Sequence, residues 1–163
     1  MAEESEKLLD ATGWQLLREL QENGRLSFRE LGQRVGLSPS SVAERVRHLE
    51  EAGILQGYHA EINLAKVGLP VLAFMRMGIP PMQMSVPPGQ TLAHVSALVC
   101  EMPEVLECYR LTGGEAFLLK VCASSVEHLG ELIDRLSQYG QTITSLVLIV
   151  HLPRRIIEPP KKR

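Results

Sequence analysis

The sequence predicts an α+β protein with two domains. Residues 1–63 should form a three-helix domain of the helix-turn-helix (winged-helix-like) type, and residues 64–163 a ferredoxin-like βαββαβ domain. Three observations predict this plan. Two helices with complete start and stop signals lie between residues 25 and 55. The apolar pattern then changes from helical spacing to alternation after Gly53. From residue 71 onward, strand-like and helix-like segments alternate.

The first helix is predicted between Asp10 and Gly24. Asp10 is a good N-terminal cap, because its carboxylate can accept a free backbone N–H of the first turn. Apolar residues from Trp14 to Leu20 recur at helical spacing, and Gly24 is expected to end the helix. Gly13 should weaken this helix by about 1 kcal/mol relative to a good helix former.

The second helix is predicted from a capping box. Ser27 and Glu30 have the S-x-x-E spacing in which each side chain satisfies a backbone N–H at the helix start. The helix should run to Val35 and end at Gly36, which tolerates a left-handed C-terminal cap.

The third helix follows a three-residue turn, residues 36–38. Ser38 caps it, Pro39 occupies its first position, where a missing N–H costs nothing, and Gly53 ends it. Two short helices joined by a tight glycine-containing turn are typical of a DNA-binding helix-turn-helix. The predicted core of the three helices consists of Trp14, Leu17, Leu20, Phe28, Leu31, Val35, Val42, Val46 and Leu49.

The second half alternates strands and helices. The predicted strands are residues 71–77, 105–111, 117–122 and 142–152, and the predicted helices are residues 91–101 and 126–138. An irregular loop with four prolines is expected over residues 79–89. Gly113 and Gly114 are expected to form a two-residue hairpin turn, and Ser124 or Ser125 to cap the last helix.

One face of the third helix is expected to read DNA. A rotation of 100° per residue places Ser40, Glu44 and Arg47 opposite the buried face, with Ser41 and His48 at its edges. Arg47 could contact guanine and Glu44 cytosine, while helix N-terminal serines suit phosphate or base contacts. The residues expected at DNA from the motif alone are Arg25, Ser27, Arg29, Ser38, Ser40, Ser41, Glu44, Arg47 and His48. The alternative is a solvated helix face, on which Arg47 forms ion pairs one turn away.

The charge of the chain limits what one such domain can do. The formal net charge is -2, and residues 1–60 hold seven Lys or Arg and ten Asp or Glu. Since phosphate contacts supply much of DNA affinity, a weakly charged domain implies several copies acting together. Positive charge gathers at the C-terminus, where a flexible, solubilising tail is expected in preference to a DNA contact. This tail contains Arg154, Arg155, Lys161, Lys162 and Arg163.

The composition favours a cytoplasmic protein without metal or cofactor. Its longest apolar runs are too short to span a membrane, and the acidic N-terminus lacks the apolar core of a secretory signal. Cys100, Cys108 and Cys122 are an odd number without a CxxC spacing, as expected of free thiols in a reducing compartment.

Motifs in both halves resemble the Lrp/AsnC (feast/famine) family of transcription regulators over roughly residues 8–153. The matching positions are Leu8-Leu9-Asp10, Gly36-Leu37-Ser38, Val42, Arg45-Val46, Leu49-Glu50, Gly53-Ile54, Gly57-Tyr58, Ala60, Val67-Gly68, Thr112-Gly113 and residues 117–121. The resemblance implies a sequence-specific DNA-binding regulator that reads pseudo-palindromic sites on double-stranded DNA. It implies sheets stacked into dimers, four of which can form an octamer. For Arg45 it implies a phosphate contact or a structural role.

The resemblance also implies an amino-acid effector site around the central hairpin. The residues concerned are Thr112, Gly113, Gly114, Glu115, Ala116 and, on the last strand, Thr144. The glycine N–H groups would meet a carboxylate, and Thr112 would add a hydroxyl. Ala116 stands where the family pattern T-G-x-x-D has an aspartate, so the obvious partner for an ammonium group is absent. The alternative is a hairpin turn without a ligand.

Two other functions stay open at this point. Some proteins of this two-domain plan resemble tetrapyrrole (sirohaem) decarboxylases, whose helix-turn-helix no longer reads DNA. The five histidines here are scattered, however, and no nucleophile–base pair is recognisable, so an enzyme is not expected. A third possibility is an assembly module with a vestigial DNA-binding domain, which only the acidic balance of residues 1–60 supports.

Overall fold

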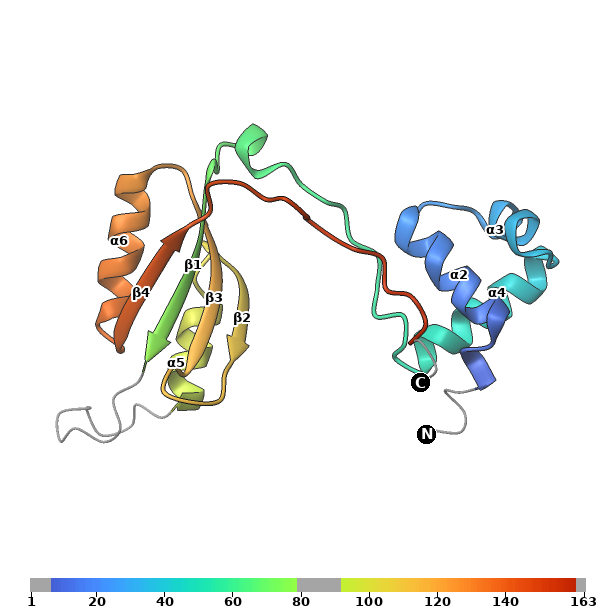
Figure 1. Ribbon diagram of the computed structural model, residues 1–163, viewed down its shortest axis with the longest axis horizontal. Coiled ribbons are helices and arrows are strands. Elements are labelled where there is room, and N and C mark those ends of the chain that lie inside the picture. Colours follow the sequence, from blue (N-terminus) through green and yellow to red (C-terminus); the bar gives the residue numbers. More distant parts are fainter. Residues whose placement is uncertain (1–6, 79–91, 161–163) are drawn as a thin grey trace. The chain divides into compact units, whose positions relative to one another are not determined.

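The computed structural model describes residues 7–78 and 92–160, which divide into two compact units (Figure 1). Unit 1 is Met1–Glu61 together with Leu152–Arg163, and unit 2 is Ile62–His151. The first division lies two residues before the expected boundary at 63/64. The C-terminal segment differs from expectation, because it groups with the helical unit and not with the ferredoxin-like domain.

Unit 1 contains the three predicted helices. They are α2 (Ala11–Glu22), α3 (Phe28–Val35) and α4 (Pro39–Glu51). Asp10, Ser27 and Ser38 cap them as predicted, and both halves of the Ser27–Glu30 capping box are present. Gly36, at φ 71°, has the left-handed conformation expected at the end of α3.

Helix α2 ends one residue earlier than predicted. Asn23 takes an extended conformation and caps the helix, with its N–H donated to the Glu19 carbonyl. Its side-chain Oδ1 then accepts the Arg25 N–H at 3.0 Å. Asn23 therefore ends the helix, which is the role that the sequence predicted for Gly24.

The core of unit 1 differs from the prediction at two aromatic residues. Leu16 is fully buried with Leu20, Leu31, Val42 and Val46. Phe28 is 45% exposed because it is the first residue of α3 and lies beside the cap, away from the packed face. Trp14 is only partly buried. The prediction that Trp14 and Phe28 are core residues was therefore wrong for Phe28 and only partly right for Trp14. Leu16, which the predicted core did not include, is fully buried.

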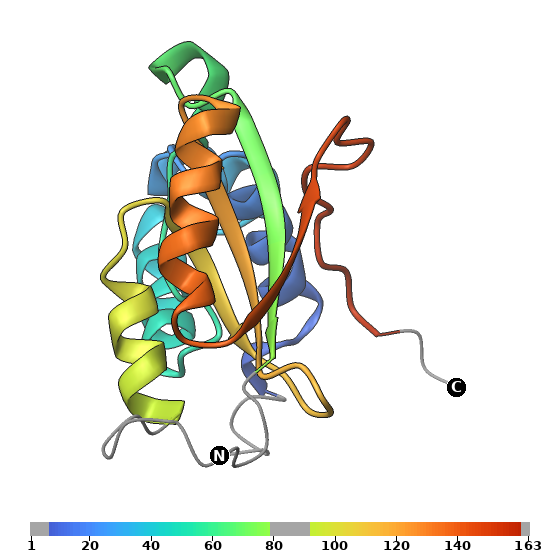
Figure 2. The same cartoon turned by 90° about the vertical axis from the view of Figure 1, so that its left-hand side faces the viewer.

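Unit 2 is a four-stranded antiparallel sheet with the predicted ferredoxin-like order of elements. Its strands, in the spatial order β2-β3-β1-β4, are β1 (Val71–Gly78), β2 (Val105–Arg110), β3 (Phe117–Ala123) and β4 (Gln141–Leu146). The helices are the 3₁₀ turn η1 (Leu64–Val67), α5 (Leu92–Cys100) and α6 (Val126–Ser137), which Ser125 caps. Helices α5 and α6 cover the same face of the sheet (Figure 2). The loop predicted over residues 79–89 and the helix start at residue 91 lie outside the described residues.

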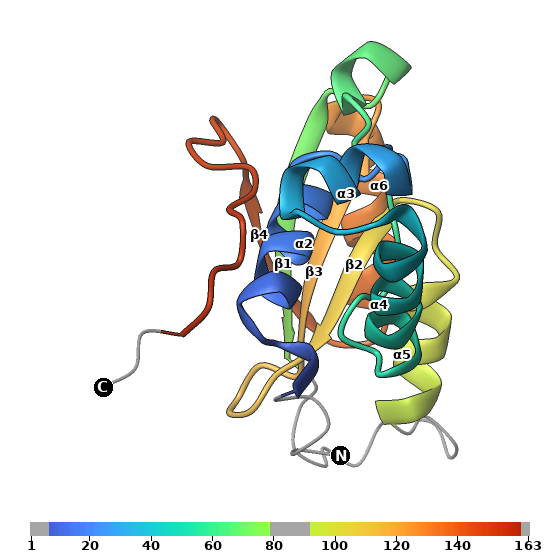
Figure 3. The ribbon, with the colours of Figure 1, turned by 90° about the vertical axis from the view of Figure 1, so that its right-hand side faces the viewer.

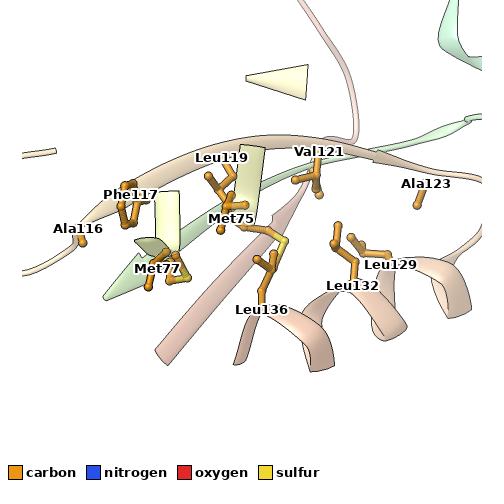
Figure 4. Close-up of a cluster of buried hydrophobic side chains, with 13 residues drawn as sticks. Met75, Met77, Ala116, Phe117, Leu119, Val121, Ala123, Leu129, Leu132 and Leu136 are labelled. Atoms are coloured by element: carbon orange, nitrogen blue, oxygen red, sulfur yellow. The ribbon is translucent and has the colours of Figure 1, made fainter. Parts of the chain in front are cut away.

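The core of unit 2 lies between the sheet and helices α5 and α6, and Figure 4 shows the side chains that pack against α6. Met75 and Met77 on β1 and Leu119 on β3 are fully buried against Leu132 and Leu136. Strand residues alternate between faces, so Arg76, which lies between these methionines, points to the face without helices. That face carries exposed apolar side chains, among them Phe74, Tyr109 and Ile143.

The β2–β3 connection is longer than the predicted two-residue turn. The Leu111 N–H donates to the Ala116 carbonyl at 2.9 Å, which leaves four residues, 112–115, outside this closing bond. Gly113 has a φ of 99°, whereas Gly114 has no positive φ. The two-residue hairpin prediction was therefore wrong.

The last strand is shorter than the predicted 142–152. It ends at Leu146, and the Val147 N–H donates to the Leu72 carbonyl at 2.9 Å, beside the start of β1. Beyond that point β1 offers no further partner, and Leu148 is 93% exposed. The apolar residues 147–150 therefore do not extend the strand, because they have no neighbouring strand to pair with.

A polar cluster fastens α6 to the segment before β2. The buried Glu104 carboxylate accepts hydrogen bonds from Arg135 and from His128 Nε2 at 3.1 Å, and His128 Nδ1 contacts Ser124 Oγ at 3.0 Å. Burial raises the pKa of Glu104, but these hydrogen bonds outweigh it and lower the pKa on balance. One carboxylate oxygen, Oε2, has no partner in the described structure.

Candidate nucleic-acid interface and effector loop

The exposed face of α4 has the composition that its helical spacing predicts. Ser40, Glu44 and Arg47 are exposed, while Ser41 and His48 are intermediate, at the edges of that face. Val42, Val46 and Leu49 are buried on the opposite side. Figure 3 shows α3 and α4 from the side of unit 1.

Arg45 is held by an ion pair within unit 1. Its two terminal nitrogens each lie 2.9 Å from a different carboxylate oxygen of Asp10, the cap of α2. The hydrogen bond from Arg45, followed by that from the Gly13 N–H, lowers the pKa of Asp10. A bidentate guanidinium–carboxylate pair fixes orientation as well as distance. Arg45 therefore joins α4 to the start of α2, which favours the structural one of its two implied roles.

Arg47 forms the ion pair that the alternative predicted for a solvated face. Its Nη1 lies 2.9 Å from Glu51 Oε1 one turn away, and its Nη2 contacts His48 Nε2 at 3.2 Å. Both partners of the Arg47–Glu51 pair are more than half exposed. Exposed pairs of this kind contribute about 0–1 kcal/mol, so a phosphate or a base edge can readily replace Glu51.

The serines at the helix starts mainly serve as caps. Ser38 Oγ accepts the Ser41 N–H at 3.2 Å and lies 2.9 Å from the hydroxyls of both Ser40 and Ser41. Ser27 donates to Glu30 Oε2 at 2.6 Å, and this bond, with the backbone bond from Ser27, lowers the pKa of Glu30.

Two cations of the predicted interface are exposed and have no acidic partner. Among the described residues, neither Arg25 nor Arg29 forms an ion pair. Arg25 follows the end of α2, and Arg29 lies in the first turn of α3. Both guanidinium groups are thus available to phosphate.

The predicted effector loop is joined to β1 through its last two residues. Ala116 is buried, and its N–H donates to the Met77 carbonyl at 2.8 Å. Glu115 forms an ion pair with Arg76, with Oε1 and Nη1 3.1 Å apart. Arg76 points away from the helices, so Glu115 lies toward the open face of the sheet.

Thr144 lies on the other face. It is the β4 partner of Met75, and directly paired residues point to the same side of a sheet. Met75 is buried under the helices, so Thr144 faces them while Glu115 does not. The structure thus separates these two predicted effector residues by the thickness of the sheet.

Sequence reasoning missed the partners of two predicted site residues. Asp10 was recognised as a cap but not as the partner of Arg45. Arg76, the partner of Glu115, had a visible signal, because it is a single charge in an otherwise apolar strand. Within residues 7–78 and 92–160, no group of three or more His, Cys, Asp or Glu side chains could hold a metal. In the same ranges, no helix is long and apolar enough to cross a membrane.

Comparison with known proteins matches both units. Residues 9–50 match an AsnC-type helix-turn-helix domain, and residues 82–157 match the Lrp/AsnC ligand binding domain. The HTH-type transcriptional regulator LrpC of Bacillus subtilis is 34% identical over 139 residues, which are 85% of this chain and 91% of that protein.

Solved structures agree. The structure of B. subtilis LrpC has a TM-score of 0.80 and 32% identity, covering 90% of this chain and 99% of that one. A feast or famine regulatory protein from M. tuberculosis, complexed with L-methionine, has a TM-score of 0.82 and 33% identity, covering 93% and 99%. The chain belongs to the Lrp/AsnC family of helix-turn-helix proteins.

Proposed function

We propose that this chain is a sequence-specific DNA-binding transcription regulator whose activity an amino acid or related small molecule modulates. The exposed face of α4 is the observation that carries the proposal. A fully capped helix presents Ser40, Glu44 and Arg47 there, inside the segment that matches an AsnC-type helix-turn-helix. The relatives named above are regulators, so the decarboxylase alternative receives no support.

In this proposal, some side chains position the domain on the DNA backbone and others recognise the base sequence. Arg25 and Arg29 hold phosphates, while Arg47 and Glu44 contact base edges in the major groove. Arg45 supports the recognition helix through Asp10, since its guanidinium is already bound at both terminal nitrogens. The protein would act in the cytoplasm, where its free cysteines would stay reduced.

Two copies are proposed to stack their open sheet faces. Phe74, Tyr109 and Ile143 are exposed apolar residues of this face on β1, β2 and β4, and contiguous apolar patches of this kind mark interfaces. A symmetric dimer would read two half-sites about 34–36 Å apart, and dimers would assemble further, up to four. A monomeric mass in solution would contradict this assembly.

The effector is proposed to be an amino acid bound at residues 112–116. The relative from M. tuberculosis was solved with L-methionine, which supports this ligand class. The N–H groups of Gly113 and Gly114 would meet the carboxylate. With Ala116 in place of an aspartate, the adjacent Glu115 would have to meet the ammonium, and it would then leave Arg76. Calorimetry with the twenty amino acids tests this, and no heat from any of them would contradict it.

The experiment for the main proposal is selection of bound fragments from the source genome, followed by binding assays with Arg47→Ala. The variant should lose about 1–3 kcal/mol of discrimination at the base that Arg47 contacts. Lys66→Ala is the matched control, since Lys66 is an exposed cation in unit 2. Undiminished specificity in Arg47→Ala would overturn the assignment of the recognition face.

A further inference from the structure

We propose that the C-terminal segment, residues 152–160, is a second phosphate-contacting element of the DNA-binding unit. We call it the C-terminal arm. This inference rests on the proposed function, because it concerns the same nucleic-acid ligand. It replaces the expectation of a merely solubilising tail.

The arm is fastened to α2 by a side chain that bonds its backbone. Gln21 Oε1 accepts the Ile157 N–H at 2.9 Å, and Gln21 Nε2 donates to the Ile157 carbonyl at 3.1 Å. One amide thereby satisfies both backbone groups of one residue. Figure 3 shows the segment, in red, running beside α2. A tail that served only solubility would need no such attachment.

The attachment brings the arm to the end of α2 from which the Arg25 loop departs. Gln21 is the penultimate residue of α2, and Arg25 follows four positions later. Arg155 precedes Ile157 by two residues, which is at most about 7 Å of extended chain. The attachment therefore restricts Arg155 and its neighbour Arg154 to the surroundings of Ile157.

The C-terminal sequence of the unit also supplies the positive charge that its helical part lacks. Residues 1–61 hold seven Lys or Arg and eleven Asp or Glu, a formal charge of −4. Residues 152–163 hold five Lys or Arg and one Glu, a formal charge of +4. With residues 152–163 the unit is formally neutral, and without them its net charge would repel a phosphate backbone.

The arm's arginines are free to meet phosphate. Arg154 and Arg155 are exposed, and neither forms an ion pair within the described part of the chain. By contrast, Arg45 and Arg47 already have carboxylate partners. Arg154 and Arg155 therefore do not neutralise the acidic residues of unit 1 by pairing with them.

The test is the salt dependence of DNA binding by the full-length protein. Fluorescence anisotropy would follow a labelled duplex of about 60 base pairs of random sequence over about 50–200 mM KCl. The Arg154→Gln/Arg155→Gln double variant should lower the slope of log K against log[salt] by about 1.8 per protomer. At the lowest salt, its affinity should fall by roughly one to two orders of magnitude. Lys66→Gln is the control and should change the slope much less.

A second variant separates attachment from charge. Gln21→Leu keeps every cation but removes both bonds to Ile157, so it should weaken binding less than the double variant does. Circular dichroism would verify that each variant is folded. If the wild type binds but the double variant keeps its slope, the arm proposal is overturned and the proposed function stands. If the wild type does not bind DNA at all, both fail. Wild-type affinity in Gln21→Leu would overturn the role of the attachment.

Discussion

The recognition helix and the effector loop differ in where the partners of their residues lie along the chain. In unit 1, each cap bonds a backbone N–H three residues away, as Ser27 does with Glu30. In unit 2, the loop is bonded to β1, through Arg76 to Glu115 and Met77 to Ala116. Local sequence therefore determines the geometry of the first site, whereas strand register determines that of the second.

The largest effect is expected from a substitution in the core of unit 2, which strand and helix packing determine. Leu132→Ala should lower the free energy of unfolding by about 2–5 kcal/mol, because Leu132 is fully buried between α6 and the sheet. Val126→Ala, at the exposed start of the same helix, should stay within about 0.5 kcal/mol. Urea denaturation measures both. Similar losses in the two variants would contradict the packing described.

At Gly13, helix propensity and steric contact predict opposite effects of an alanine substitution. Propensity alone predicts that Gly13→Ala stabilises α2 by about 1 kcal/mol. A Cβ at Gly13, however, would lie 1.9 Å from the Leu8 carbonyl oxygen, so we expect a loss of about 1–3 kcal/mol. Gly130→Ala is the control, since a Cβ there meets nothing within 4 Å and should stabilise α6. Thermal denaturation measures the change in stability of both variants. A Gly13→Ala variant more stable than the wild type would show that helix propensity outweighs the contact with Leu8.

Arg45 and Arg47 should differ in what their loss affects. Arg45→Ala removes the link to Asp10 and should cost roughly 0.5–1 kcal/mol of stability, as this pair is partly exposed. Arg47→Ala should change stability by less than about 0.5 kcal/mol and act on DNA binding instead. Denaturation combined with anisotropy measures the two effects. A large stability loss in Arg47→Ala would reverse the assignment.

The smallest effect is expected on acidification. Asp10 and Glu104 have folded-state pKa values below their ordinary 3.8 and 4.5. Each contributes stability that is complete above its ordinary value and is lost as the pH falls through the folded-state value. Glu104→Gln should remove the component that begins near pH 4.5, and Asp10→Asn the one near 3.8. Melting temperatures between neutral and acidic pH would show these losses, and an unchanged profile in both variants would contradict them.

The same difference explains how far the sequence predicted the molecule. The caps of α2, α3 and α4 and the exposed face of α4 followed from residues three or four positions apart. The last strand was predicted too long because its end depends on where β1 begins, and Leu148 has no neighbouring strand. Thr144 and Glu115 were grouped although register places them on opposite faces. No local pattern indicates that Gln21 binds Ile157.

The attachment of Ile157 to Gln21 closes a loop of 136 positions that includes the whole of unit 2. Closing a flexible loop of that length costs about 4 kcal/mol, whereas two hydrogen bonds contribute about 1 kcal/mol each. The two hydrogen bonds alone would therefore not compensate for the entropy lost in closing the loop. They form because β1 and β4 already bring Leu72 and Val147 together at 2.9 Å, which shortens the loop that remains to be closed. Docking of the arm on the DNA-binding unit thus depends on strand pairing in the effector domain.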